Sequence, residues 1–538
     1  MGARDSGFDW SELSSNCITR RSMLKLLAGS AAGLSALSVF DVPPADSAAT
    51  PGGHLVAGWN FDAIKLLDPA YMNVVEQMQV ASNVLSGLVH VHVGFVVKPD
   101  LAEKWEVSKD GLTWTFQLRK GVVFHNGQKF NADDVEYTYK RTKDPKVASI
   151  HRSRLDIVEK FEKLGEYEVR FKLKSPSAAF LMSSLSRVPA RAMTIVCRTA
   201  LEKMGKDAYN IMPVGTGPFR VAKHQIGSDI VLEKNPDYFV SGLPKLDKVT
   251  IKMVPESATQ ANALRAGDIQ FLNKPPVALL DQLLADTNLK IEETPDPGTW
   301  GLFFQQANVP QFRDKRVRLA IAKAINKEQV VEKAYMGRAI PMYEAVNPAQ
   351  TLYYRGNTKE TSPQRYNPEE AQRLWREAGM PKGFKFKMMC ADFLGFLRVA
   401  QVLKPMIDGT LGTDAEVMQM DPAIFHDRHA AGKYETSVLG TGMDFDPNDS
   451  LDDIFGTKSK FNNFAYSNSK VDELLKQQFE EGDLQKRIKL VHQISDIVTE
   501  DAPWAFLVHH YDYTAMNKAV KGYVKIPALR ELATLTLS

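Results

Sequence analysis

Hydrophobic and polar positions alternate strictly in one stretch near the start of the chain. From Leu112 to Leu118 every second residue is apolar and those between are polar, a period of two that predicts a strand with one buried face. Asp110 and Gly111, just before it, form a dipeptide typical of tight hairpin turns, and Trp105 to Val107 supplies a partner strand. We therefore expect a β-hairpin here.

A helix is predicted directly after this hairpin. His125 to Gln128 reads as a second turn, and Asn131 stands where a helix N-cap would be, with Asp134 three residues later. Phe130 precedes the cap, at the position of a hydrophobic staple. The local order is thus strand, turn, strand, turn, capped helix.

Strands and helices alternate along the rest of the chain. Ser257, with Gln260 at the capping-box position, is expected to cap a helix that Gly267 closes, and Asn326 and Asn367 are expected to start two others. Further strands are predicted at 53–59, 167–173, 219–222, 230–234, 248–254, 300–305, 384–389, 438–441 and 505–509. Further helices are predicted at 75–89, 178–185, 314–324, 399–411, 471–475 and 488–498.

Length and composition restrict the class of protein. A chain of 538 residues is too long for one hydrophobic core, so two or more domains are expected, and the alternation of strands and helices in both halves predicts α/β lobes. The change to helices near Asn308 marks a candidate hinge. Apolar and charged fractions of 44% and 24% are those of a soluble globular protein. A net charge of +3 without a Lys/Arg run argues against a nucleic-acid binder.

The N-terminus has the order of an export signal. Arg20, Arg21 and Lys25 precede an apolar run, Leu26 to Phe40, and small residues follow up to Ala49, where we expect cleavage. The paired arginines resemble a twin-arginine signal. A membrane anchor is the alternative, but the run is short and rich in Gly, Ala and Ser. We therefore expect the mature protein to be soluble and periplasmic.

The amino-acid sequence of this hairpin-and-helix segment is more specific than the arrangement of its strands and helix. Ala102 to Arg141 (AEKWEVSKDGLTWTFQLRKGVVFHNGQKFNADDVEYTYKR) closely resembles the hallmark region of the extracellular solute-binding proteins of ABC importers, in the oligopeptide, dipeptide and nickel-binding family (family 5). Five further segments carry the same resemblance: Gly215 to Val221, Leu232 to Phe239, Leu264 to Phe271, Asp314 to Val331 and Tyr366 to Gly379. The resemblance covers most of the chain after about residue 52.

The resemblance implies a fold and a function. The fold would be the α/β, two-lobed periplasmic-binding-protein fold of cluster C type, with an extra subdomain in the first lobe. We expect a signal peptide at 1–49, lobe I at 50–303 with the subdomain at 66–210, lobe II at 304–505, and a return to lobe I at 506–538. The protein would be a monomer without cofactor or catalytic activity. It would capture a peptide or peptide-like solute in a cleft between the lobes and deliver it to an ABC permease of the inner membrane.

The same resemblance points to one loop as the ligand site. In family members the loop matching Leu439 to Pro447 often carries Trp, then Asp, then Asp-Pro, and an acidic residue there binds the amino group of the peptide. Asp444 fits this carboxylate and Asp446 is its rival, while Thr441, Gly442 and Met443 occupy the region of the Trp. The alternative is an acidic turn that caps the following helix.

Three further residues are candidates for the walls of the site. Trp300 and, less clearly, Trp59 would supply aromatic surfaces, although core packing explains either equally simply. Asp392 lies where some relatives have an arginine for the carboxylate of the ligand. An acidic set of Asp392, Asp444 and Asp446 would suit a cationic or amine-bearing solute.

Some features of the sequence allow functions other than peptide binding. His90 and His92 share a strand face and could bind a metal or metal chelate, whereas the adjacent His509 and His510 would point to opposite faces. No phosphate-binding loop, nucleophile elbow or zinc-protease motif supports an enzyme. An amine, opine or sugar remains an alternative solute. The two cysteines of the mature chain, Cys197 and Cys390, are expected to be buried free thiols, with a disulfide as the alternative.

Overall fold

The computed structural model describes residues 52–59, 64–92, 96–187, 192–356, 358–392, 395–441, 445–459 and 461–538. The chain divides into two compact units, which are described separately. Unit 1 comprises residues 1–294, 480–485 and 512–538, and unit 2 comprises 295–479 and 486–511. The expected signal peptide lies outside the described residues.

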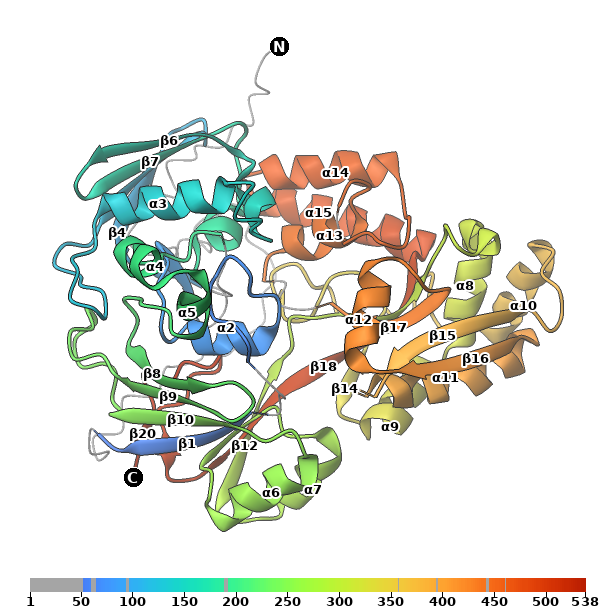
Figure 1. The fold of residues 1–538 in the computed structure, drawn as a ribbon. Coiled ribbons are helices and arrows are strands. Elements are labelled where there is room, and N and C mark those ends of the chain that lie inside the picture. Colours follow the sequence, from blue (N-terminus) through green and yellow to red (C-terminus); the bar gives the residue numbers. More distant parts are fainter. Residues whose placement is uncertain are drawn as a thin grey trace, which may run out of the picture. The chain divides into compact units, whose positions relative to one another are not determined.

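The main sheet of unit 1 is mixed (Figure 1). Strand β1 pairs in parallel with both β10 and β11, whereas the pairs β8–β9, β9–β10 and β11–β18 are antiparallel. The strand order is β8, β9, β10, β1, β11 and then the C-terminal part of β18, with β12 also paired to β18. The strands are β1 (His54–Trp59), β8 (Phe219–Gln225), β9 (Asp229–Lys234), β10 (Lys248–Met253), β11 (Phe271–Asn273), β12 (Leu289–Pro295) and β18 (Trp504–Asn517).

A second sheet in unit 1 contains the predicted hairpin. Its order is β4, β5, β7, β6, and the burial of β5 alternates along the strand as predicted. Helix α3 packs on β6 and β7, and Asn131 and Asp134 form the predicted capping box. The apolar core of this region involves residues between Leu88 and Tyr209, within the range expected for the subdomain. The elements are β4 (Ala102–Val107), β5 (Thr113–Leu118), α3 (Ala132–Lys143), β6 (Val158–Gly165), β7 (Glu168–Leu173), α4 (Arg198–Met204) and α5 (Lys206–Ile211).

The helix predicted at 75–89 is shorter in the structure. Helix α2 (Val75–Ala81) ends where the chain turns beneath another segment, since the N–H of Gly217 donates to the Val84 carbonyl at 2.9 Å. A β-carbon on Gly215 would lie 2.1 Å from that carbonyl oxygen, so only glycine allows this approach. The apolar spacing after Ala81 therefore reflects burial under the glycine loop and not a continued helix.

The helix predicted to begin at Ser257 has a different cap. The N-cap of α6 (Ser257–Ala266) is Glu256, whose carboxylate accepts hydrogen bonds from the N–H groups of Ala258 and Thr259. The side chain of Gln260 instead donates to the Val254 carbonyl. The carboxylate of Glu256, one residue before Ser257, accepts from the free N–H groups at the positive end of the helix. The predicted position of the cap was therefore wrong by one residue.

Unit 2 is built on a second mixed sheet, with the order β16, β15, β17, β13 and the N-terminal part of β18 (Figure 1). Strand β15 pairs in parallel with β16 and β17, while β13 is antiparallel to both its neighbours. The short strand β14 pairs with β18. The strands are β13 (Trp300–Phe304), β14 (Ala339–Pro341), β15 (Lys385–Ala391), β16 (Asp414–Met420) and β17 (Thr436–Gly440).

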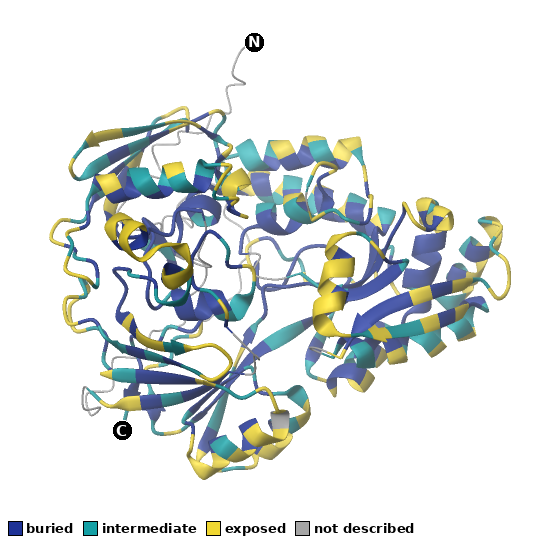
Figure 2. Cartoon of the chain, in the orientation of Figure 1, coloured by how far each residue is buried: buried dark blue, intermediate teal, exposed yellow. Residues whose placement is uncertain are grey.

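The helices of unit 2 follow the predicted caps closely. Asn326 and Asn367 accept hydrogen bonds from the N–H groups of Gln329 and Glu370, as expected for the N-caps of α9 and α10. Figure 2 shows the central strands mostly buried and α10 with one exposed face. The helices are α8 (Lys315–Ala324), α9 (Lys327–Tyr335), α10 (Pro368–Glu377), α11 (Phe396–Leu411), α12 (Pro422–Ala430), α13 (Pro447–Phe455), α14 (Ser469–Glu480) and α15 (Leu484–Asp501).

The division between the units differs from the expected boundaries. It falls at 294/295 and 511/512, where we expected 303/304 and 505/506. Strand β13 pairs with β17 and with the Trp504–Val508 part of β18, which all belong to unit 2. Asn308, the candidate hinge, lies inside unit 2, and its side chain donates to the carbonyls of Gly432 and Tyr434 at 2.8 Å each. A hinge near Asn308 remains a prediction.

Two expectations from the sequence concern the cysteines and a membrane span. Cys197 and Cys390 are both buried free thiols, and burial, reinforced by Asp392, raises the pKa of Cys390 to about 11. Cys390 is therefore not a thiolate at neutral pH. Among the described residues, no helix is both long and apolar enough for a membrane span.

Unit 2 also contains a buried lysine that forms no ion pair with any residue the structure describes. Lys327, at the start of α9, is fully buried, and its Nζ donates to the Met342 carbonyl at 2.6 Å and lies 4.6 Å from the centre of the Tyr343 ring. Burial lowers its pKa from 10.5 to about 7, against a smaller opposing effect of Glu328. The folded chain thus releases this proton at a pH where the unfolded chain still holds it.

Replacing Lys327 by methionine should stabilise the protein at pH 7 by about 1–2 kcal/mol. In the wild type, stability is lost as the pH falls from 10.5 to 7, because only the unfolded chain takes up the proton in that interval. The variant lacks this dependence, so its advantage should shrink as the pH rises toward 10. Urea unfolding at pH 7 and pH 9.5 measures the difference. An equal advantage at both values would contradict the assignment.

Candidate functional site

The loop predicted to bind the ligand begins at the end of β17. There Thr441 is tied to the segment before β13: its N–H donates to the Thr299 carbonyl at 2.9 Å, and its hydroxyl oxygen accepts from the Thr299 N–H at 3.0 Å. A β-carbon on Gly298 would lie 2.2 Å from the Thr441 carbonyl oxygen. The two segments therefore approach so closely that position 298 has no room for a side chain.

Trp300, the predicted aromatic wall, is 5% exposed and packs inside unit 2. Its ring contacts Phe396 and His510, with centroid distances of 4.6 and 4.3 Å, and lies edge-on to Tyr335. A β-carbon on Gly440 would lie 2.8 Å from its indole nitrogen. Trp300 thus supports the strand end that carries Thr441, which is the core-packing alternative considered from the sequence.

Asp446, the rival carboxylate, closes the other end of the loop. Its side chain caps α13 by accepting from the Asn448 N–H at 2.8 Å, and Pro447 occupies the first helical turn. The same carboxylate forms a two-pronged ion pair with Arg487, one prong measuring 3.0 Å, and both side chains are less than 10% exposed. The alternative of a capping acid is confirmed, and both oxygens of Asp446 accept hydrogen bonds.

Arg487 is held from several sides. Its guanidinium also donates to the Tyr353 hydroxyl at 3.0 Å and to the side-chain oxygen of Gln478. Burial alone would lower the pKa of Arg487, but Asp446 outweighs this effect and holds the pKa above its usual value. Arg487 is therefore a cation at any physiological pH, and its ion pair with Asp446 joins the start of α13 to α15.

The other predicted site residues lie elsewhere. Gly442, Met443 and Asp444 fall outside the described residues. Asp392 is exposed at the end of β15 in unit 2, whereas Trp59 belongs to unit 1. Trp59 is fully buried, stacks on Phe271, and donates its indole N–H to Gln79 at 3.2 Å. Unit 2 therefore brings Thr441 and Trp300 to one strand end, Asp446 lies at the start of α13, and Trp59 packs in the core of the other unit.

The histidines proposed as metal ligands have other surroundings. His90 and His92 lie edge-to-face at 5.8 Å, but the ring of His90 is buried beside Arg187, and burial followed by this cation lowers its pKa well below normal. His510 packs on Trp300, while His509 bonds through Nδ1 to the Gly298 carbonyl at 3.1 Å. Within the described part of the chain, no three His, Cys, Asp or Glu side chains could together hold a metal ion.

Two residues near the loop were missed by the sequence analysis. Arg487 lies three residues after Leu484 and four before Val491, so it falls on the buried face of α15, and a charge on an apolar stripe could have signalled a buried partner. His509 is fully buried, and burial lowers its pKa to about 4, so it is a neutral hydrogen-bond donor to the turn at Gly298. Nothing in the local sequence indicates that contact.

Comparison with known proteins places the chain in a family. The profile of the bacterial extracellular solute-binding proteins, family 5 Middle, matches residues 96–463, more than half of the chain. The chain belongs to this family. The resemblance of its opening stretch and its two-lobed α/β fold are thereby confirmed.

Relatives of this family 5 protein match along nearly their whole length. The glutathione-binding protein GsiB of Shigella flexneri serotype 5b (strain 8401) is 30% identical over 516 residues, covering 92% of this chain and 96% of that protein. The periplasmic binding protein DppA of Helicobacter pylori, in complex with the peptide STSA, superposes with a TM-score of 0.80 at 26% identity, covering 91% and 98% of the chains. The oligopeptide-binding protein AppA of Bacillus subtilis, with a nonapeptide, gives 0.80 at 25% identity and covers 91% and 100%.

Proposed function

We propose that this solute-binding protein captures a peptide or peptide-like solute, including compounds of the glutathione type, and delivers it to an ABC permease. The observation that carries the proposal is the full-length match to proteins named for peptide or glutathione binding, two of them solved with bound peptides. The protein would act by binding alone, and the energy for transport would come from ATP hydrolysis in another polypeptide. We retain lobe closure around the solute as the capture mechanism.

The proposed contact for the amino group of the solute is Asp444. The loop that carries it begins at Thr441, which is fixed to Thr299, and ends at Asp446, which is fixed to Arg487. Because Asp446 is engaged by Arg487 and by the helix it caps, Asp444 is the better candidate of the two. Asp392, exposed in the same unit, could add negative potential without contacting the amine.

The export signal also forms part of the proposal. We infer that residues 1–49 direct the chain to the periplasm through a twin-arginine-like signal and are removed near Ala49. N-terminal sequencing of the protein from the periplasm would identify the cleavage site. A mature protein that retains Arg20 and Arg21 would contradict cleavage.

Native mass spectrometry of the protein purified from its own periplasm tests the choice of solute. Co-purifying peptides, or a mass equal to that of glutathione, would support the proposal. A single unrelated mass would overturn the peptide assignment while leaving family membership untouched. Isothermal titration with glutathione and with a mixed tripeptide library then separates the two solute types.

Replacing Asp444 by asparagine should weaken binding of an amine-bearing peptide about 10- to 100-fold, because one charge-assisted hydrogen bond contributes about 1.5–3 kcal/mol. Calorimetry measures the affinity. A peptide with an acetylated amino terminus should bind the wild type and the variant equally, since the amine is absent. The control variant is Asp392→Asn, for which we expect less than a threefold change. Unchanged binding by Asp444→Asn would remove this residue from the site.

A further inference from the structure

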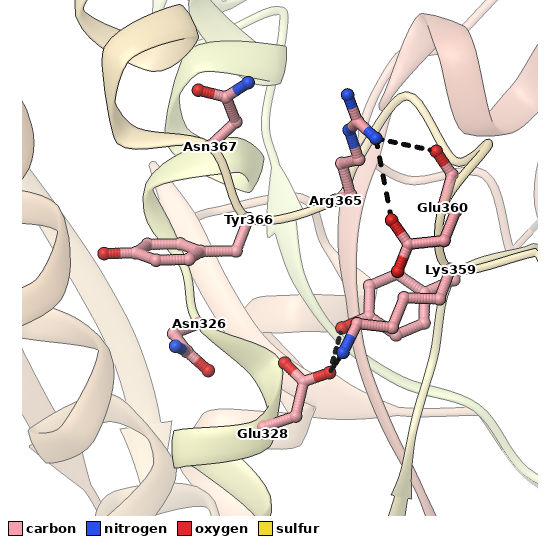
Figure 3. Close-up of a pocket in the computed structure, with 8 residues that line it drawn as sticks. Asn326, Glu328, Lys359, Glu360, Arg365, Tyr366 and Asn367 are labelled. Atoms are coloured by element: carbon pink, nitrogen blue, oxygen red, sulfur yellow. Dashed lines mark hydrogen bonds and ion pairs between the residues drawn. The ribbon is translucent and has the colours of Figure 1, made fainter.

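Unit 2 has a polar surface pocket that lies apart from the loop described above. Its volume is about 410 Å³, within the range of roughly 300–1,000 Å³ found for small-molecule sites. It lies where α9 and α10 begin, beside the segment that precedes α10 (Figure 3). The lining residues are Asn326, Glu328, Tyr343, Lys359, Glu360, Arg365, Tyr366 and Asn367.

The carboxylate of Glu328 in this pocket is already paired through one of its two oxygens, Oε1. It accepts from the Tyr343 hydroxyl at 2.7 Å and forms an ion pair with Lys359 at 2.7 Å (Figure 3). Burial would raise the pKa of Glu328. The hydrogen bonds from Lys359 and from the Tyr343 hydroxyl outweigh burial and hold the pKa below its usual value. Glu328 therefore has little remaining capacity to attract a cation.

Most of the hydrogen-bonding capacity that remains open in the pocket is that of donors. The side-chain oxygens of Asn326 and Asn367 are used as helix caps, so each amide presents its NH₂ group to the pocket. The guanidinium of Arg365 donates only to the Glu360 carbonyl, at 2.9 Å, and lies 3.8 Å from the exposed Glu360 carboxylate. Among the described residues its remaining N–H groups have no acceptor. Tyr366, 43% exposed, lies between the two asparagines in Figure 3.

The charge around the pocket is positive on one side. Lys323 lies behind it, with its carbonyl accepting from the Asn367 N–H at 3.0 Å, and its ammonium forms no ion pair within the described part of the chain. Burial lowers the pKa of Lys323, and the nearby Arg365 and Arg373 lower it further against the effect of Glu370. Arg373 is already paired with Glu370 and Glu377, so Lys323 and Arg365 are the two cations whose potential would stabilise an anion here.

We propose that this pocket binds a small anion bearing carboxylate or phosphate groups, with Arg365 as its principal contact and the Asn326 and Asn367 amides as additional donors. A planar guanidinium with free N–H groups matches the paired oxygens of either group. The volume accommodates an organic anion as well as inorganic phosphate. This site is independent of the solute proposed for the family function.

The test is calorimetric titration of the mature protein with inorganic phosphate and, separately, with citrate. We expect saturable binding of at least one of them, weakened about tenfold or more in Arg365→Gln. The matched control is Arg373→Gln, since Arg373 is equally exposed but already paired with both Glu370 and Glu377 at 2.6 Å. That variant should bind as the wild type does.

The same titrations identify the chemistry of the ligand. Binding of phosphate without citrate assigns a phosphate group, and the reverse assigns carboxylates. No saturable binding of either probe by the wild type would overturn the proposal. Equal affinities for the wild type and Arg365→Gln would overturn it as well, since the anion would then bind elsewhere. Lys323→Gln is a second variant, for which we expect a smaller loss from the weakened potential.

Discussion

Arg530→Met should lower the free energy of unfolding by about 3–5 kcal/mol, because it leaves a buried carboxylate without its cation. Arg530 is 1% exposed and forms two hydrogen bonds with the fully buried side chain of Asp512, at 2.9 and 2.7 Å. Its Nε donates to Asn273 at 2.7 Å. The variant removes all of these bonds while preserving most of the side-chain volume. Urea unfolding monitored by circular dichroism measures the loss.

The expected size of this loss follows from the position of the pair. Asp512 is the first residue of unit 1 after β18 leaves unit 2, and Arg530 lies on the C-terminal segment. That segment is fixed further by Asn83, which donates to the Arg530 carbonyl and accepts from the Leu532 N–H. The ion pair and the hydrogen bond to Asn273 thus join β18, β11 and the C-terminal segment within the core of unit 1.

A matched exposed pair provides the control for Arg530. Arg220 and Glu233 lie 3.1 Å apart on neighbouring strands of unit 1, but both side chains are about half exposed. Arg220→Met should change stability by less than about 0.5 kcal/mol, since exposed ion pairs contribute little. A loss below 1 kcal/mol for Arg530→Met would show that the carboxylate relaxes into water. Combining it with Asp512→Asn should recover part of the loss, because the buried charge is gone.

Local patterns in the sequence predicted the elements whose signals are local. The period of two in β5, the capping box of α3 and the asparagine caps of α9 and α10 depend on residues within four positions of one another, and all are present. Hydrophobic spacing failed for α2, because burial after Ala81 comes from a glycine loop about 130 residues away. Periodicity records burial, and it cannot distinguish which partner causes it.

The candidate site was predictable only in part, for the same reason. The Asp-Pro pair marked a helix start, and Asp446 is that cap. Its second partner, Arg487, is 41 residues further along the chain, so the sequence could suggest a buried charge but not its counter-ion. The contacts of Thr441 with Thr299 bridge 142 residues and require the pairing of β13 with β17 to be known. The contacts of the site that the sequence did not predict therefore depend on pairing between segments that lie far apart in the chain.

Arg487→Met should destabilise unit 2 by about 3–5 kcal/mol, because Asp446 stays buried while its cation is lost. Adding Asp446→Asn should restore much of this loss. Asparagine is as good an N-cap as aspartate, so α13 keeps its cap and no unpaired charge remains. Urea unfolding of the two single variants and the double variant gives the coupling energy of the pair. Additive losses would contradict the buried ion pair.

The same double variant decides between Asp444 and Asp446 as the amine contact. If Asp446 serves only to hold the loop, the double variant should bind the solute about as tightly as the wild type once its stability returns. If Asp446 contacts the solute, affinity should stay low although stability recovers, because the neutral amide cannot pair with an ammonium group. Calorimetry with the natural solute separates these outcomes. We expect recovery, since Arg487 and the Asn448 N–H already occupy both oxygens of this carboxylate.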